Sequence, residues 1–97
     1  MIILPNQALS WQYHTRREEV WKVIVGPVGT IISNTDELTD PVIHQADELI
    51  FIQVNQRHRL IGLDNIAIVA ELWVHTDEHN LSNELDIVRV RDDYGRQ

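Results

Sequence analysis

The chain has 97 residues, of which 43% are hydrophobic and 24% charged, which predicts one folded domain over residues 1–97 and argues against a disordered protein. Its formal net charge of −7 at pH 7 would repel DNA or RNA, so we expect no nucleic-acid partner. The sequence contains no cysteine, which excludes disulfides, thiolate metal sites and cysteine nucleophiles.

The first ten residues, MIILPNQALS, have neither the basic flank nor the apolar length of a secretory signal. No apolar run along the chain reaches the roughly 18 residues that a membrane-spanning helix needs. We therefore expect a cytoplasmic protein that does not bind membranes.

Segments rich in β-branched residues predict strands at residues 20–25, 49–54, 66–74 and 87–90. Turn-forming residues such as Gly26-Pro27 and Asp40-Pro41 separate these segments. No stretch of about ten residues keeps the apolar spacing of an amphipathic helix. The pattern predicts an all-β fold, either an antiparallel sandwich or a barrel.

Residues that are able to bind a metal lie around the polar run 15–18. On an extended strand Gln12 and His14 point the same way, and the polar run can turn the chain. If the next strand starts at Glu19, this carboxylate lies on the core face, which we expect to contain Trp21, Val23 and Val25. A buried carboxylate is costly unless it is paired with a cation or a metal.

His58 is the best candidate for a further ligand, because it follows an apolar strand and a polar turn. Two imidazoles, one carboxylate and one amide oxygen suit one divalent metal, with zinc as the first choice and manganese, iron, cobalt or nickel as alternatives. Such a site keeps a net positive charge, which favours Lewis-acid chemistry on an oxygen-rich substrate. The alternative for each residue is a structural or surface role.

The spacing Gln-x-His-x4-Glu, followed much later by His, resembles the metal motif of the cupins. Longer strings are similar to the isomerase domain of type II mannose-6-phosphate isomerases. They are Leu9-Ser10-Trp11-Gln12-Tyr13-His14, then Arg17-x-Glu19-x-Trp21-x-Val23-x-x-Gly26, and near the end Asp86-Ile87-Val88-Arg89 and Asp92-x-Tyr94-Gly95-Arg96.

This resemblance implies a small cupin barrel, also called a jelly roll or double-stranded β-helix. It implies Gln12, His14, Glu19 and His58 as the metal ligands. The implied activity is the interconversion of mannose 6-phosphate and fructose 6-phosphate, in nucleotide-sugar or polysaccharide biosynthesis. The implied partner is therefore a phosphorylated sugar.

The sequence also departs from the family pattern. Thr15 and Arg16 stand where the family has histidines, and Asn55 stands where a turn glycine is usual, so we expect Asn55 in the left-handed conformation. Extra residues within 74–83 enlarge a loop. The family's strands before Met1 are missing, which predicts an N-terminally shortened barrel with an exposed edge, and a homodimer that covers it.

Glu71 and Arg59 are the catalytic candidates, Glu71 as a general base or as support for a ligand histidine. Four arginines, Arg16, Arg17, Arg57 and Arg89, are candidates for binding the phosphate, with Arg96 as a further one. The alternative is that these arginines form surface ion pairs and that Glu71 lies on an exposed edge.

The remaining histidines, His44, His75 and His79, are expected to face solvent. Among the tryptophans we expect Trp21 in the core and Trp11 at an edge or dimer contact, and any of Trp11, Trp21 and Trp73 could stack on a sugar. Two other functions stay open: a non-catalytic cupin that serves as a sugar-binding or regulatory module, and a cupin that acts on a different sugar, such as an epimerase.

Overall fold

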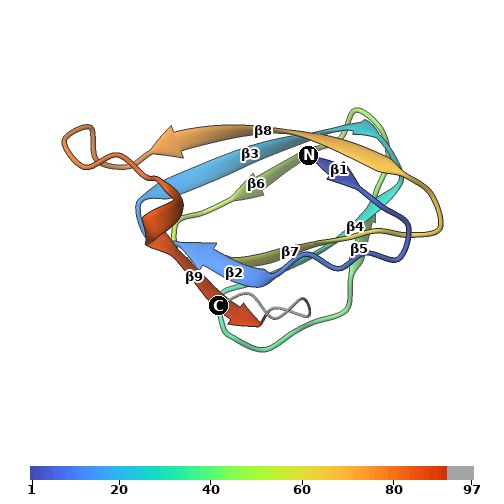
Figure 1. The fold of residues 1–97 in the computed structure, drawn as a ribbon, viewed down its shortest axis with the longest axis horizontal. Coiled ribbons are helices and arrows are strands. Elements are labelled where there is room, and N and C mark those ends of the chain that lie inside the picture. Colours follow the sequence, from blue (N-terminus) through green and yellow to red (C-terminus); the bar gives the residue numbers. More distant parts are fainter. Residues whose placement is uncertain (92–97) are drawn as a thin grey trace.

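Strands make up almost all of the regular structure in the computed structural model, which describes residues 1–91 (Figure 1). In chain order they are β1 (Ile2–Ile3), β2 (Trp11–His14), β3 (Arg17–Val25), β4 (Val28–Ser33), β5 (Val42–His44), β6 (Leu49–Ile52), β7 (Arg57–Ile61), β8 (Ala67–His75) and β9 (Ile87–Arg91). A short 3-10 turn, Glu84–Asp86, precedes β9. Within residues 1–91 there is no helix long and apolar enough to cross a membrane.

The strands form two antiparallel sheets that lie face to face (Figure 1). One sheet has the order β1-β8-β3-β6 and the other the order β5-β4-β7-β2-β9. Most neighbours in each sheet are distant in the sequence, and the chain passes between sheets at Thr15-Arg16, from β2 to β3. This is the two-sheet jelly-roll arrangement, and the prediction of an all-β fold is confirmed.

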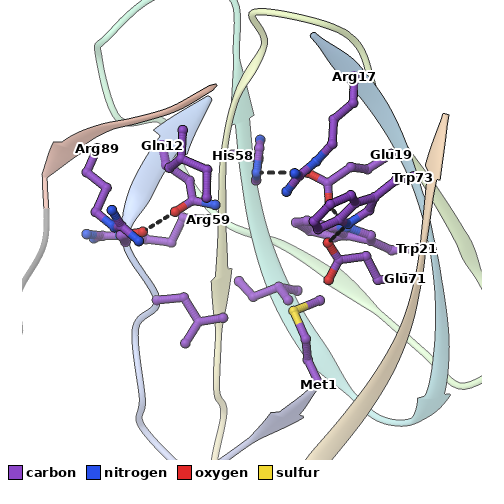
Figure 2. Close-up of a pocket in the computed structure, with 14 residues that line it drawn as sticks. Met1, Gln12, Arg17, Glu19, Trp21, His58, Arg59, Glu71, Trp73 and Arg89 are labelled. Carbon is purple, nitrogen blue, oxygen red and sulfur yellow. Dashed lines mark hydrogen bonds and ion pairs between the residues drawn. The ribbon is translucent and has the colours of Figure 1, made fainter. Parts of the chain in front are cut away.

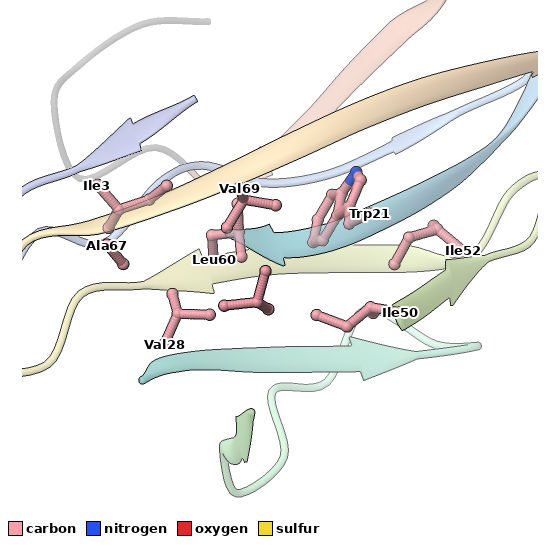
Figure 3. Close-up of a cluster of buried hydrophobic side chains, with 9 residues drawn as sticks. Ile3, Trp21, Val28, Ile50, Ile52, Leu60, Ala67 and Val69 are labelled. Atoms are coloured by element: carbon pink, nitrogen blue, oxygen red, sulfur yellow. The ribbon is translucent and has the colours of Figure 1, made fainter. Parts of the chain in front are cut away.

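Inward-facing side chains divide the interior into a polar end and an apolar end. Along β3 the buried residues alternate, as a strand requires: Arg17 and Glu19 come first, then Trp21, then Val23. The apolar end holds a core of Ile3, Trp21, Val23, Val28, Ile50, Ile52, Leu60, Ala67 and Val69 (Figure 3). Burial of each large aliphatic side chain there contributes about 1.5–3 kcal/mol to the free energy of folding. The core therefore supports the strands whose other ends carry the polar residues.

The prediction that Val25 faces the core is wrong. Val23 pairs with Val69, but Val25 pairs with Ile68, so β3 advances two residues while β8 advances one. This bulge breaks the alternation, and both Ile24 and Val25 are exposed. Trp11 also differs from expectation, because it is only 1% exposed and its indole N–H donates to the carbonyl of Asp36 at 2.9 Å. The segment that contains Asp36 covers it.

The turn between β6 and β7 forms as predicted. Asn55 has a φ of 64°, the left-handed conformation that its short polar side chain tolerates. Its backbone N–H donates to the carbonyl of His14 at 2.8 Å. The turn thereby fixes the start of β7, and with it His58, against the end of β2.

Candidate metal centre

Three predicted ligands, His14, Glu19 and His58, meet at the polar end of the interior. His14 ends β2, Glu19 lies near the start of β3, and His58 is the second residue of β7. Each is at most 3% exposed. Nδ1 of His58 lies 3.1 Å from the carbonyl of Gln56, which leaves Nε2 as the nitrogen that faces the interior.

The donor atoms of these three residues fit one metal ion. Nε2 of His14 lies 2.9 Å and Nε2 of His58 lies 3.5 Å from Oε2 of Glu19, and the donors all lie within 4.8 Å of one another. Trp21 donates to the other oxygen, Oε1, at 3.1 Å, which directs Oε2 at the histidines. Among residues 1–91, Oε2 of Glu19 and Nε2 of His58 have no hydrogen-bond partner. Buried donors of this kind, two imidazoles and a carboxylate, suit zinc with bonds of about 2.0–2.2 Å.

Gln12, the fourth predicted ligand, lies beside this group. It pairs with His58 across β2 and β7, and its Nε2 is 3.4 Å from Nε2 of His14. Its Oε1 accepts a hydrogen bond from Ser10 instead of facing the histidines. Rotation of the Gln12 amide by half a turn about its Cγ–Cδ bond would exchange Oε1 and Nε2 and present the oxygen to a metal.

The electrostatics favour the ionisation states that a metal requires. Burial would raise the pKa of Glu19, but His14, Glu71 and His58 outweigh it and hold this pKa far below its ordinary value. Burial lowers the pKa of His58 to about 4, although the Glu19 carboxylate opposes this. At neutral pH Glu19 is therefore an anion and His58 is neutral, as in metal-bound sites.

A pocket of about 240 Å³ lies beside these ligands and is lined by Glu19, His58 and Gln12 (Figure 2). Its two walls follow the strand register. Arg89 pairs with Gln12, and Gln12 with His58, so these three form one row across β9, β2 and β7. On the facing sheet Glu19 pairs with Trp73 and Trp21 with Glu71.

Glu71 therefore lies on the inner side of β8 and lines the pocket, where its side chain is exposed to solvent. Trp73 donates to its Oε1 at 2.5 Å. Partial burial, together with a hydrogen bond to Glu19, raises the pKa of Glu71 to about 7. Arg17 and Arg59 also border this pocket, as does Arg89.

Arg16 and Arg57 do not border the pocket. Arg16 lies on the turn after β2, where its guanidinium donates to Asn80 and Asn83. Arg57 stacks on Tyr13, with Cζ 3.9 Å from the ring centroid, and bonds to Asp36 at 2.8 Å. Arg96 and the predicted family signature at residues 92–96 lie outside the described residues.

Two buried polar residues in the loop between β8 and β9, Ser82 and Asp86, were not predicted. Asp86 accepts hydrogen bonds from Ser82, Asn83 and the backbone of Arg16. Burial opposes ionisation of Asp86, but these bonds prevail and lower its pKa. The pattern Asn83-x-x-Asp86 is a capping box, and this signal could have shown that the loop is ordered.

The other histidines follow the prediction only in part. His79 is 89% exposed and His75 is exposed. His44 was expected to face solvent, but its side chain is only 16% exposed and lies 2.8 Å from the hydroxyl of Thr30. Its neighbours on β4 shield it.

No protein-family model and no curated protein matches the sequence. Solved structures do match. The plu4264 protein from Photorhabdus luminescens is similar over 80% of this chain and 59% of its own, with 24% identity and a TM-score of 0.61. The capsular polysaccharide assembling protein CapF from Staphylococcus aureus is similar over 94% of this chain, with 20% identity and a TM-score of 0.70. A second CapF structure, with the inhibitor 3-isopropenyl-tropolone, has 21% identity and a TM-score of 0.68.

This chain spans 27% of the first CapF chain and 26% of the second, so the likeness concerns one part of that larger protein. At these identities the comparisons establish the fold. That fold is a small jelly-roll barrel of the cupin type.

Proposed function

We propose that this small cupin is a metal-dependent isomerase of sugar phosphates, of the type that interconverts mannose 6-phosphate and fructose 6-phosphate. The observation that carries the proposal is the buried group of His14, Glu19 and His58, two of which line a pocket that has Arg89 on one wall and Glu71 on the other. The likeness to CapF, a capsular polysaccharide assembling protein, supports a place in nucleotide-sugar or polysaccharide biosynthesis.

The size of the pocket supports a small substrate. About 240 Å³ is less than the roughly 300–1,000 Å³ of typical sites for drug-sized ligands. One sugar unit suits such a volume better than a nucleotide sugar does. Arg89 would bind the phosphate, because its Nε is buried and has no hydrogen-bond partner within residues 1–91.

The reaction moves one hydrogen from C2 to C1 of the open-chain sugar and another from the oxygen on C2 to the oxygen on C1. No electron acceptor is required. A divalent ion held by Gln12, His14, Glu19 and His58 would supply Lewis-acid stabilisation of the two oxygens. Glu71 is the residue placed to take the proton from C2 and return it to C1, and the indole of Trp73 orients it.

A coupled assay for fructose 6-phosphate, with protein loaded in turn with zinc, manganese, cobalt and nickel, tests this proposal. We expect turnover of mannose 6-phosphate, and a loss of at least about 100-fold in kcat for Glu71→Gln, the usual contribution of a general base. Glu18→Gln, at an exposed position on β3, is the matched control and should retain activity. Absence of turnover with all four metals would refute the isomerase function.

A second function is favoured by the position of Arg17. Its guanidinium covers the face of Trp73, with Cζ 3.4 Å from the ring centroid, where a sugar would otherwise stack. In this alternative the chain is a non-catalytic sugar-binding or regulatory cupin. Calorimetric binding of mannose 6-phosphate without any turnover would support it.

The outer face of the β1-β8-β3-β6 sheet supports the proposal of a homodimer. Val20 of β3 lies opposite both Phe51 and Leu72, and the next outward residue, Lys22, lies opposite Leu49 and Ala70. The large side chains around Lys22 form one exposed apolar surface: Ile24, Leu49, Phe51, Leu72 and Val74. A second copy of the same face would bury it.

Light scattering coupled to size exclusion measures this association. We expect a mass of twice 11.3 kDa for the wild type. The double variant Phe51→Asp, Leu72→Asp should be a folded monomer, because two buried charges without partners oppose association. Leu85→Asp introduces the same charge at a residue that is 89% exposed elsewhere, and should leave the mass unchanged. A monomeric wild type would contradict the dimer.

A further inference from the structure

A cation of the protein itself lies against the metal ligands. The side chain of Arg17 is 3% exposed, and on β3 it faces inward, as Glu19 does (Figure 2). Its Nη2 lies 3.1 Å from Nε2 of His14, and its Nε lies 3.8 Å from Oε2 of Glu19. These are two of the three donor atoms that would bind a metal.

The guanidinium is held there by other contacts. It stacks on Trp73, a cation–π arrangement, and its Nη1 donates to the hydroxyl of Ser82 at 3.2 Å. Ser82 in turn donates to Asp86, which accepts a hydrogen bond from the backbone of Arg16. The loop between β8 and β9 therefore keeps Arg17 beside the ligands.

Arg17 and a metal ion cannot both bind the same atoms of His14 and Glu19 at the same time. The Nε2 lone pair of His14 either accepts a hydrogen bond from Arg17 or coordinates a metal. Glu19 likewise offers one carboxylate charge to both. A divalent ion next to a guanidinium is also repelled by it, and this repulsion is strong where water is excluded.

We propose that Arg17 is an internal cation that competes with the metal and sets how tightly the site binds it. Metal entry requires the guanidinium to withdraw from His14 and Glu19. This inference rests on the proposed metal site, and it concerns the affinity of that site and not the substrate. Arg17 thus lowers the metal affinity of the site without being a ligand or a catalytic residue.

Titration with zinc, and with cobalt in competition against a chromophoric chelator, tests the proposal on the purified chain. Arg17→Gln should bind metal at least about tenfold more tightly than the wild type, equivalent to about 1.4 kcal/mol. Arg17→Lys, which keeps the charge, should gain less than Arg17→Gln. Lys22→Gln, which removes one positive charge from an exposed position on the outer face of the same strand, should bind as the wild type does.

Equal or weaker metal binding by Arg17→Gln would overturn the proposal. If Arg17→Gln does not fold, Ser82→Ala provides the second test. It frees the guanidinium without removing it, and a gain of about threefold is expected, with no gain counting against the proposal. If neither the wild type nor any variant binds metal, the metal site itself is refuted, which distinguishes that failure from the failure of competition.

Discussion

Replacing His58 with alanine is expected to remove one equivalent of bound metal and to weaken metal binding by more than about 100-fold. Loss of residues that only support a ligand already costs about 10- to 100-fold, and His58 is proposed as a ligand itself. Its Nε2 is buried, faces Glu19 at 3.5 Å and has no hydrogen-bond partner among the described residues. Elemental analysis of purified protein, together with a zinc titration, measures both effects.

His79→Ala is the matched control, because the side chain is 89% exposed and distant in sequence from every proposed ligand. It should retain the full metal equivalent. A His58→Ala protein that keeps its metal, while circular dichroism shows a wild-type fold, would contradict the proposed ligand set.

Gly62→Ala is expected to destabilise the fold by about 3 kcal/mol or more, although it adds one methyl group. A Cβ at position 62 would lie 2.0 Å from the carbonyl oxygen of Leu4 and 3.1 Å from the amide nitrogen of Gln7. Both are backbone atoms, so no side chain can rotate away. The segment from Leu4 to Gln7 would have to leave β7, together with the hydrogen bond from the Gly62 N–H to the carbonyl of Gln7.

Thermal unfolding measures this effect. A domain of this size shifts its Tm by about 4–8 °C per kcal/mol, so a decrease above about 12 °C is expected. Gly29→Ala is the control, since its new Cβ would meet neighbours no closer than 3.5 Å and should change the Tm little. Similar Tm values for the two variants would show that the close approach at Gly62 does not exist.

Two local rules predict part of the ligand group, and the resemblance to the cupin metal motif implies the whole set. Alternation along β3 places Glu19 with Trp21 on the inner face, and the same rule places Gln12 with His14 on β2. The turn at Asn55 then determines where β7 begins. These rules do not determine that β7 lies beside β2, which is a long-range pairing. The structure confirms that His14, Glu19 and His58 converge.

The predicted roles of the arginines do not take the alternation of side chains along a strand into account. Arg16 and Arg17 have the same predicted role, but Arg17 has the same strand parity as Glu19 and faces inward, while Arg16 lies on the turn. By the same rule Arg57 lies on the opposite face of β7 from His58, where it stacks on Tyr13. Alternation was available in the sequence and would have separated these residues.

Other differences could not be found from local patterns. The bulge that exposes Val25 inserts one residue into β3 relative to β8, and nothing within 20–25 indicates it. Burial of Trp11 depends on a segment 25 residues further along the chain, which folds back over it. Such contacts depend on the tertiary arrangement of the sheets.

Lys22 gives the chain a property that is useful in practice. It is the single lysine of the 97-residue sequence, and it is exposed on the outer face of β3, one residue from Trp21 and on the opposite side of the sheet. An acylating dye would therefore modify one side-chain amine, away from the ligand atoms. Fluorescence from a label on Lys22 would report what happens on the outer face, and Trp21 beneath it would be a natural energy-transfer donor.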